Sequence, residues 1–389
     1  MNLDKIRAET PGIKNVIHLN NCGAGLMPQP VLDAVVTHLK REAEIGGYEA
    51  AREAEAAIEN SYYALASMLN CRRDELAVVE NATVAWDMAF YGLPLEKGDV
   101  VLTAVSEYAS NYIAYLQRAK RDGIEVRIIP NDKFGRTDPA ALATMINDKR
   151  VKLISITHLP TNGGLINPAS KIGNIAQNAG IPYLLDACQS VGHLPIDVQA
   201  IGCDMLSGTG RKYLRGPRGT GFLFVRSSIL NKLDPPVLDL HSAKWTEPNR
   251  FEILSGTRRF ENWENYIAGK IGLGVAVDYA LNIGLDAIAE RITNLADGLR
   301  QQMLEISGVT VQDIGKKKSG IISFTVHGKD PNWVMRDLEA NGINISVSGA
   351  GSTLLDMRQR GISKMNRIGL HYYNTEVELE RFVKCLAAI

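Results

Sequence analysis

The chain has no surplus of either charge, because 43 Lys and Arg residues balance 43 Asp and Glu residues. Without a basic excess, the phosphate backbone of a nucleic acid meets no evident attraction, and nucleic acid is not an expected partner. The opening MNLDKIRAETPGIKNVIHL lacks the basic and continuous apolar regions of a secretory signal, and no apolar run reaches the length of a membrane span. We therefore expect a cytoplasmic protein with no membrane partner.

Cysteine is scarce, and its few positions exclude two kinds of site. The count is odd, no CxxC pair occurs, and no cysteine has a metal-ligand spacing to histidine. Neither a disulfide framework nor a metal site is expected, and the thiols are free, as in a reducing compartment. A GxGxxG after the first strand and a GxxxxGK(S/T) loop are missing as well, which disfavours a nucleotide-binding α/β protein. The five cysteines are Cys22, Cys71, Cys188, Cys203 and Cys385.

What the sequence does contain is a regular alternation of helical stretches and short apolar runs between about residues 30 and 245. This alternation predicts an α/β domain whose mostly parallel sheet is buried on both faces. The ligand of such a domain lies beyond the carboxyl ends of its strands. The predicted strands are DELAVVENA, DVVLTAV, EVRIIP, VKLISITH, IPYLLDA, CDMLSG and GFLFVR.

A smaller α+β lobe is predicted to follow. The stretch 262–306 is helical in pattern with a break near residues 282–284, and the short apolar runs VTVQDI, GIISFTV, INISVS and RIGLHYY come after it. A chain of 389 residues is long enough for two lobes. We predict an N-terminal segment (1–29) near the entrance of the site, a large domain (30–262) and a small C-terminal domain (263–389).

The segment SGTGRKYLRGPRGTG places Lys212 in a glycine-rich turn between two predicted strands. On this segment alone, Lys212 is equally well an ordinary surface lysine. The strand IPYLLDACQS ends in Asp186 and Gln189. An acidic group at the carboxyl end of a buried strand points into the ligand crevice of an α/β sheet, which favours a site that contains both Asp186 and Lys212.

Two further segments lie where a strand passes into a helix. ENATVAWD (80–87) has the small and hydroxyl residues of a helix N-cap, and the same geometry binds phosphate through free N–H groups and the helix dipole. In VSEYASNY (105–112), Tyr108 is either a core aromatic or a ring that stacks on a planar ligand.

Together these segments resemble the fold type I pyridoxal-phosphate (PLP) enzymes, specifically the class V aminotransferase and cysteine desulfurase superfamily. The resemblance covers almost the whole chain, with motifs in the expected order, and it implies the aspartate aminotransferase-like, PLP-dependent transferase fold. The matching segments are HLPTNGGLINP (158–168), DACQSVGHLPID (186–197), TGRKYLRGPRG (209–219), SGTRRFENWE (255–264) and RIGLHYYNTE (367–376).

The resemblance implies a role for each matching residue. Lys212 would hold PLP as a Schiff base and carry the substrate's α proton, Asp186 would pair with the ring nitrogen, and Tyr108 would stack on the ring. Arg367, otherwise a surface arginine at a strand start, would clamp the substrate carboxylate. Gln189, with Thr161 or Asn162, would lie near the phenolic oxygen of the cofactor. The phosphate would be held by Ala82, Thr83, Thr209 and Arg211, with Thr257 reaching across the interface of a homodimer.

Three departures from the desulfurases refine this picture. Tyr108 and Arg211 stand where desulfurases usually have histidine, as in the branch that resembles isopenicillin N epimerase and hercynylcysteine sulfoxide lyase. The stretch NISVSGAGSTLLD (344–356) contains no cysteine to accept sulfur, which disfavours sulfur transfer. The segments 19–28 and 42–50 also resemble that branch, so Asn21 and Cys22 are candidates for substrate binding, although a small buried cysteine is the plainer interpretation of Cys22.

The expected function is that of a PLP enzyme acting on a small amino acid or a cysteine-derived substrate through a quinonoid intermediate. β-Elimination at a carbon–sulfur bond stands slightly ahead of transamination. Epimerisation is the next alternative and needs a second acid, for which Tyr108 and His371 are weak candidates. A non-catalytic PLP-fold protein would need a phosphate site but not Lys212, Asp186 and Arg367 together. Cys188 is given no catalytic role, because it faces the same way as Asp186 only if the strand continues.

Overall fold

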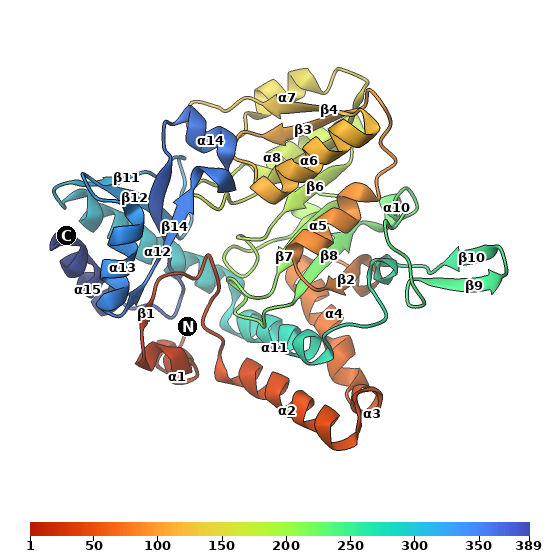
Figure 1. Cartoon of the computed structure of the whole chain (residues 1–389), viewed down its shortest axis with the longest axis horizontal. Helices are drawn as coiled ribbons and strands as arrows, with labels where there is room; N and C mark the ends of the chain where they lie inside the picture. Colours follow the sequence, from red (N-terminus) through yellow and green to blue (C-terminus); the bar gives the residue numbers. More distant parts are fainter.

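The computed structural model describes residues 1–389, and its centre is a seven-stranded sheet with the order β2-β8-β7-β6-β5-β3-β4 (Figure 1). Each of the seven predicted apolar runs forms one of these strands, which confirms the predicted fold class. The strands are β2 (Leu76–Val79), β3 (Val100–Ala104), β4 (Glu125–Ile129), β5 (Val151–Thr157), β6 (Tyr183–Asp186), β7 (Met205–Thr209) and β8 (Gly221–Val225).

The pairing in this sheet is parallel from β4 through β3, β5 and β6 to β7, whereas β8 runs antiparallel to both β7 and β2. Because parallel strands end at a common edge, the residues that follow β5, β6 and β7 come together there. The turn that contains Lys212 connects β7 to the reversed strand β8, so it lies at the same edge.

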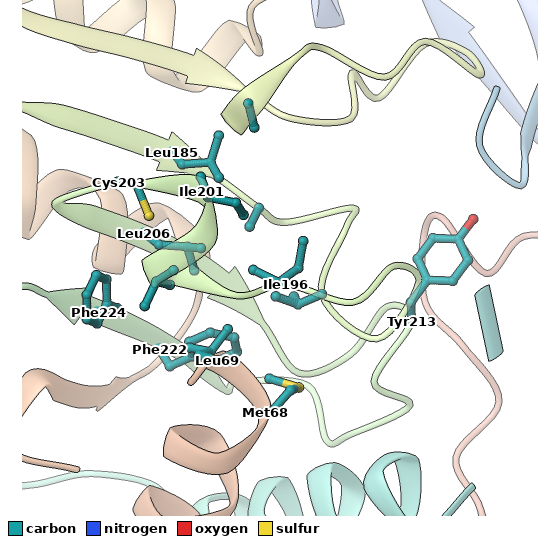
Figure 2. Close-up of a cluster of buried hydrophobic side chains, with 14 of the residues drawn as sticks. Met68, Leu69, Leu185, Ile196, Ile201, Cys203, Leu206, Tyr213, Phe222 and Phe224 are labelled. Atoms are coloured by element: carbon teal, nitrogen blue, oxygen red, sulfur yellow. The ribbon is translucent and has the colours of Figure 1, made fainter. Parts of the chain in front are cut away.

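Alternate residues of the strands enter two separate cores, because successive side chains of a strand point to opposite faces. Leu76 and Val78 belong to one apolar cluster, and Ala77 and Val79 belong to the other. Figure 2 shows part of the first cluster, where Met68 and Leu69 at the end of helix α4 (Glu55–Leu69) pack beneath the sheet. The strand side chains in this view are Leu185, Leu206, Phe222 and Phe224. The prediction of a sheet buried on both faces is therefore correct.

Helices cover both faces of the large sheet. The long α11 is almost wholly apolar and packs against α4 and α2, so this helix joins the large lobe although it follows the predicted boundary near residue 263. The boundary itself stays a prediction. These helices are α2 (Gln29–Ile45), α3 (Gly47–Glu53), α5 (Ala82–Tyr91), α6 (Ala109–Asp122), α7 (Pro139–Met145), α8 (Ala169–Ala179), α9 (Val198–Ile201), α10 (Ser227–Leu230) and α11 (Ile267–Ile283).

The second lobe is built on a four-stranded antiparallel sheet in the order β11-β12-β15-β14, with its own apolar core. The N-terminal segment joins this lobe, because β1 pairs with β13 in parallel and Asn20 bridges to Gly369. The strands are β1 (Ile17–His18), β11 (Val309–Val311), β12 (Ile321–Val326), β13 (Ile343–Asn344), β14 (Ser346–Gly349) and β15 (Lys364–Gly369). The helices are α1 (Leu3–Ala8), α12 (Leu285–Leu304), α13 (Pro331–Ala340), α14 (Leu354–Gln359) and α15 (Glu376–Ala387).

The predicted break in the long helical stretch falls at Gly284, whose φ of 96° favours glycine. No single helix has both the length and the apolar composition of a membrane span. The one pair that reaches both together, α11 with α12, is bent by 77°.

A projecting hairpin is among the elements that were not predicted from the sequence. The hairpin of β9 (Ala243–Glu247) and β10 (Arg250–Ile253) projects from the body of the molecule, on the right in Figure 1. Its paired residues Trp245 and Phe251 are 73% and 57% exposed. Exposed aromatic pairs are unusual on the free surface of a monomer, which makes the hairpin a candidate contact surface.

Candidate active site

A cavity of about 400 Å³ lies where the carboxyl ends of β5 and β6 face the N-terminus of α5. Eight of the residues predicted for the site line it: Ala82, Thr83, Tyr108, Thr161, Asp186, Gln189, Arg211 and Lys212. Asn81, Val84, Asn111, Thr157, Leu159 and Cys188 complete the lining. Residues from five separate segments of the sequence therefore meet around one space large enough for a small cofactor.

Lys212 supplies the amine of the cavity. Only 9% of Lys212 is exposed, and its Nζ lies 3.4 Å from Cys188 Sγ. No carboxylate forms an ion pair with it. The turn is held from the N-terminal segment, since the N–H of Gly25 donates to the carbonyl of Arg211 and a side chain at position 25 would collide with the Lys212 carbonyl.

Asp186 ends β6 and is 4% exposed. Its carboxylate accepts hydrogen bonds from Asn111 Nδ2 at 3.0 Å and from the N–H of Cys188 at 2.9 Å. Burial raises the pKa of Asp186, because water no longer stabilises the charged form, and the two donors and the nearby Lys212 oppose this effect. A protonated ring nitrogen beside this carboxylate would supply the cation that the chain does not provide within ion-pair distance.

The opposite end of the cavity is suited to an anion. Asn81 caps α5 by accepting from the N–H of Val84, which leaves the N–H groups of Ala82 and Thr83 without an acceptor inside the helix. Arg211 extends toward this end, with Nη1 at 3.1 Å from Thr209 Oγ1, and no carboxylate neutralises it. Free amides, a helix N-terminus and an unpaired guanidinium together bind a phosphate.

Between the two ends, one acceptor has no partner. Gln189 is 2% exposed, and its Oε1 is buried without a hydrogen bond, whereas its Nε2 donates to Thr161 Oγ1 and to the carbonyl of Cys22. An unpaired buried oxygen is costly unless a ligand donates to it. A cofactor with a hydroxyl or a protonated nitrogen near this point removes that cost.

Arg367 on β15 reaches the same corner from the small lobe. Its Nη1 donates to Thr161 Oγ1 at 2.6 Å and to the Thr161 carbonyl at 2.7 Å, and its Nε donates to Ser346 Oγ. All these partners are neutral, so the guanidinium has charge left to attract a carboxylate. The predicted carboxylate clamp thus lies beside the cavity, and its role stays a prediction.

Other predicted site residues do not line this cavity. Asn162 donates to Asp356, and Asn21 uses both side-chain atoms on Gly369, His18 and Tyr373. Cys22 is 1% exposed and packs against Gly369, so the structure favours the plainer interpretation of a small buried residue. The substrate-binding roles of Asn21 and Cys22 find no support in this geometry, because neither side chain is free.

Thr209 touches the site only through Arg211, and Thr257 begins a short 3-10 helix (Thr257–Phe260) outside the cavity wall. His371, a weak candidate for a second acid, is fully buried with Nε2 at 3.1 Å from the Tyr213 carbonyl and does not reach the cavity. Burial pushes the pKa of His371 well below its ordinary value, so this ring has no proton to give at neutral pH.

The sequence argument missed Asn111 and Thr157 and gave Cys188 no role. Asn111 lies one helical turn after Glu107, and an i, i+4 polar pair directly after a buried strand was an available signal. Cys188 was judged by strand alternation, but β6 ends at Asp186 and the following turn carries the thiol into the cavity. The direction of the Cys188 side chain is therefore set by the turn and not by the strand.

An anion cradle, a buried carboxylate and a lysine amine between them match the phosphate, the ring nitrogen and the aldehyde of PLP, and this fold with this site defines a PLP-dependent enzyme. The family model for class-V aminotransferases matches residues 17–382. The chain belongs to the class-V aminotransferase family.

Relatives and solved structures agree with this assignment. A probable cysteine desulfurase of Methanothermobacter thermautotrophicus is 28% identical over 395 residues, covering 100% of this chain and 98% of the relative. The apo structure of a cysteine desulfurase from Thermococcus onnurineus superposes with a TM-score of 0.92 at 25% identity, covering 99% and 97% of the two chains. A cystine C–S lyase, C-DES, solved with its product cysteine persulfide, shares the fold with a TM-score of 0.87 at 22% identity, covering 97% and 99%.

We predict that Lys212→Ala abolishes covalent retention of PLP. Purified wild-type protein should absorb in the visible range and, after borohydride reduction, carry the cofactor on the tryptic peptide that contains Lys212. The variant should bind PLP only reversibly and show no modified peptide. Lys120→Ala, which removes an exposed lysine of α6, serves as the control and should retain the cofactor fully. Covalent PLP on the Lys212→Ala variant would refute the assignment of the lysine.

Proposed function

We propose that this enzyme acts on a small amino acid or a cysteine-derived substrate, with β-elimination at a carbon–sulfur bond as its main reaction. The proposal rests on one observation above others: the segment 344–356, which forms β14 and α14 beside the site, presents no thiol that could take sulfur from a substrate. Arg367 forms hydrogen bonds only with neutral groups and has no carboxylate partner, which supports a substrate with an α-carboxylate. The shared fold of the C–S lyase C-DES is compatible with this chemistry.

In this proposal each group of the chain has a definite task. Ala82, Thr83 and Arg211 hold the phosphate, Asp186 keeps the ring nitrogen protonated, and Tyr108 covers the ring. Bound PLP supplies an electron sink for the pair left on the substrate's α carbon. Lys212 Nζ takes the α proton, since it is the amine closest to the reacting carbon once the substrate is bound.

The second proton transfer of Lys212 decides the outcome. In elimination, the Cβ–S bond breaks, sulfur leaves with the bonding electrons, and Lys212 returns its proton to the sulfur. In transamination, Lys212 would instead deliver the same proton to the bound cofactor. The segment 344–356 has no thiol that could accept sulfur from the substrate, which favours release of the sulfur group as the leaving group, and elimination is the reaction we propose first.

The products separate these outcomes. With cysteine, cystine or a cysteine S-conjugate and no added keto acid, the holoenzyme should release pyruvate, ammonia and a sulfur product over many turnovers. A transaminase would instead stop after one turnover until a keto acid is added. Lys212→Ala serves as the inactive control. Sustained turnover that strictly requires a keto acid would overturn the proposal in favour of the aminotransferase alternative.

A desulfurase-like transfer of sulfur to the protein is the second candidate, and two observations favour it: the curated relatives bear that name, and the cavity does contain a thiol. Cys188 Sγ lies 3.4 Å from Lys212 Nζ. Against it, burial raises the pKa of Cys188, so little nucleophilic thiolate is present, although Lys212 and Arg211 act in the opposite direction.

Cys188→Ala tests this candidate directly. We expect the variant to keep at least about half of the wild-type rate of pyruvate formation, or of alanine formation where that is the product, because a thiol that stays protonated takes no part in the elimination. Persulfide-specific labelling of the protein after reaction with cysteine should be absent from both proteins. A persulfide on Cys188 in the wild type, together with loss of turnover in Cys188→Ala, would establish the desulfurase alternative.

Epimerisation is left with a single candidate for the second acid. His371 does not reach the cavity, whereas Tyr108 lines it and is 36% exposed. Release of the D-isomer from an L-amino acid without pyruvate is the outcome that would bring this reaction forward.

We also propose that the enzyme works as a homodimer in which Thr257 completes the phosphate site of the other subunit. The Oγ1 of Thr257 has no hydrogen-bond partner within the chain, and because Thr257 is fully buried in its own subunit, this contact requires the segment around it to move when the subunits pair. The exposed aromatic pair of the β9–β10 hairpin and exposed apolar residues beside it, including Leu240 and Trp263, support a further subunit at this side.

Mixed dimers test whether Thr257 acts in the phosphate site of the other subunit. Lys212→Ala and Thr257→Ala subunits, each unable to load PLP normally as homodimers, should regain one normal site when they are mixed. That site combines the intact Lys212 of one chain with the intact Thr257 of the other. Covalent PLP should recover to about one per mixed dimer. If uptake does not recover, or if light scattering gives a monomer that binds PLP fully, the cross-subunit role is excluded.

A further inference from the structure

A second buried carboxylate lies behind the cofactor cavity. Glu107 precedes α6 and is 3% exposed. Its two oxygens accept five hydrogen bonds: from the backbone N–H groups of Tyr108 and Thr157, from the hydroxyls of Thr103 and Thr157, and from the amide of Asn111. No lysine, arginine or histidine forms an ion pair with it. The Glu107 carboxylate is therefore held by five hydrogen-bond donors and by no cation.

Four of these five donors belong to three residues that line the cavity: Tyr108, Asn111 and Thr157. Thr157 ends β5, Tyr108 precedes α6, and Asn111 lies in the first turn of α6. Glu107, which does not itself line the cavity, therefore fixes the end of β5 and the start of α6 in the cavity wall. Loss of this carboxylate would leave several buried donors without an acceptor.

Asn111 connects Glu107 to the carboxylate of Asp186. Its Nδ2 donates one hydrogen to Glu107 Oε1 at 2.9 Å and the other to Asp186 Oδ2 at 3.0 Å. Since both acceptors are carboxylates, the amide nitrogen and not the amide oxygen must face them. The orientation of Asp186 is thus set by the N–H of Cys188 on one oxygen and by an amide that Glu107 holds on the other.

The two carboxylates also act on each other through their charge. Burial raises the pKa of Glu107 to about 7, and the negative charge of Asp186 contributes in the same direction. Tyr115 of α6 and Tyr183 of β6, the other titratable groups that face Glu107, are fully buried phenols, and Glu107 helps to raise the pKa of each. Two neighbouring carboxylates without a cation repel each other, and a protonated ring nitrogen would relieve that repulsion.

We propose that Glu107 and Asn111 are positioning residues that hold Asp186 against the ring nitrogen of the cofactor and so favour the protonated ring. The proposal rests on the assignment of PLP to this cavity, and it holds for any of the reactions considered above. Its test therefore uses cofactor binding and not turnover.

The experiment compares PLP with an analogue in which CH replaces the ring nitrogen. Apoprotein is titrated with each compound, and the ratio of the two affinities measures how strongly the site recognises the ring nitrogen. Wild-type protein should prefer PLP. In Glu107→Gln and Asn111→Ala this preference should fall by at least about tenfold, the usual effect of losing a hydrogen bond to a charged group, while the affinity for the analogue changes little.

Asp87→Asn is the matched control. Asp87 is a half-buried carboxylate of α5 in the same lobe, and burial raises its pKa to about 6, but it does not line the cavity. This variant should keep the wild-type preference. Thermal unfolding of all the apoproteins detects a general loss of stability, and if Glu107→Gln does not fold, Asn111→Ala decides the matter.

Two results overturn the proposal. The first is an unchanged preference for PLP in the variants that fold. The second is an equal loss of affinity for PLP and for the analogue, which would mean that Glu107 and Asn111 only support the cavity wall. Either result would leave the assignment of Lys212 and the reaction of the enzyme untouched, because the titrations involve no amino-acid substrate.

Discussion

The structure depends on a carboxylate that is buried without a cation. Asp186 ends a central strand, where only the amide of Asn111 and one backbone N–H donate to it. Burying an unpaired negative charge is expensive, and the protein reduces that cost with directed donors but does not remove it. The free-energy cost that remains favours a ligand that carries a positive charge. The Asp186 end of the cavity is accordingly a site for a protonated heterocycle.

The rest of the cavity follows from the directions of the strands. Because β5, β6 and β7 run in parallel, Thr157, Asp186 and the turn with Lys212 appear at one edge of the sheet, although they are far apart in the sequence. At the other end of the cavity, the N-terminus of α5 favours a negatively charged group. A molecule with a phosphate at one end and a protonated ring at the other is therefore oriented before any residue contacts its reactive carbon.

The small lobe controls this site through one loop of the large lobe. Thr161 accepts from Arg367 and from Gln189, so a single hydroxyl joins the proposed carboxylate clamp to the residue proposed for the phenolic oxygen. Nearby, Asn162 contacts Asp356, and the N–H of Gly164 donates to Asp313. A substrate carboxylate that draws Arg367 away from Thr161 would alter the surroundings of Gln189. Binding of the substrate and the polarity around the cofactor are thus physically coupled.

Sequence reasoning recovered the large sheet because its strands are short, apolar along their length and separated by helices. It recovered Lys212, Asp186 and the α5 N-terminus because strand ends determine which residues meet. It could not find the bridge at Asn111, which needs the distance between a helix turn and a neighbouring strand. It could not place the Cys188 side chain, because β6 ends at Asp186 and the turn that follows has no fixed alternation. The β9–β10 hairpin was missed because it packs on nothing in its own chain and so has no apolar periodicity.

The position of Cys188 also bears on the difference between this chain and its relatives that are named desulfurases. A sulfur acceptor must be ionised to attack and mobile to pass its sulfur on. Cys188 lies in a turn fixed by Asp186, deep in the cavity and beside Lys212, and burial opposes its ionisation. Burial of this thiol therefore argues against Cys188 as a sulfur acceptor.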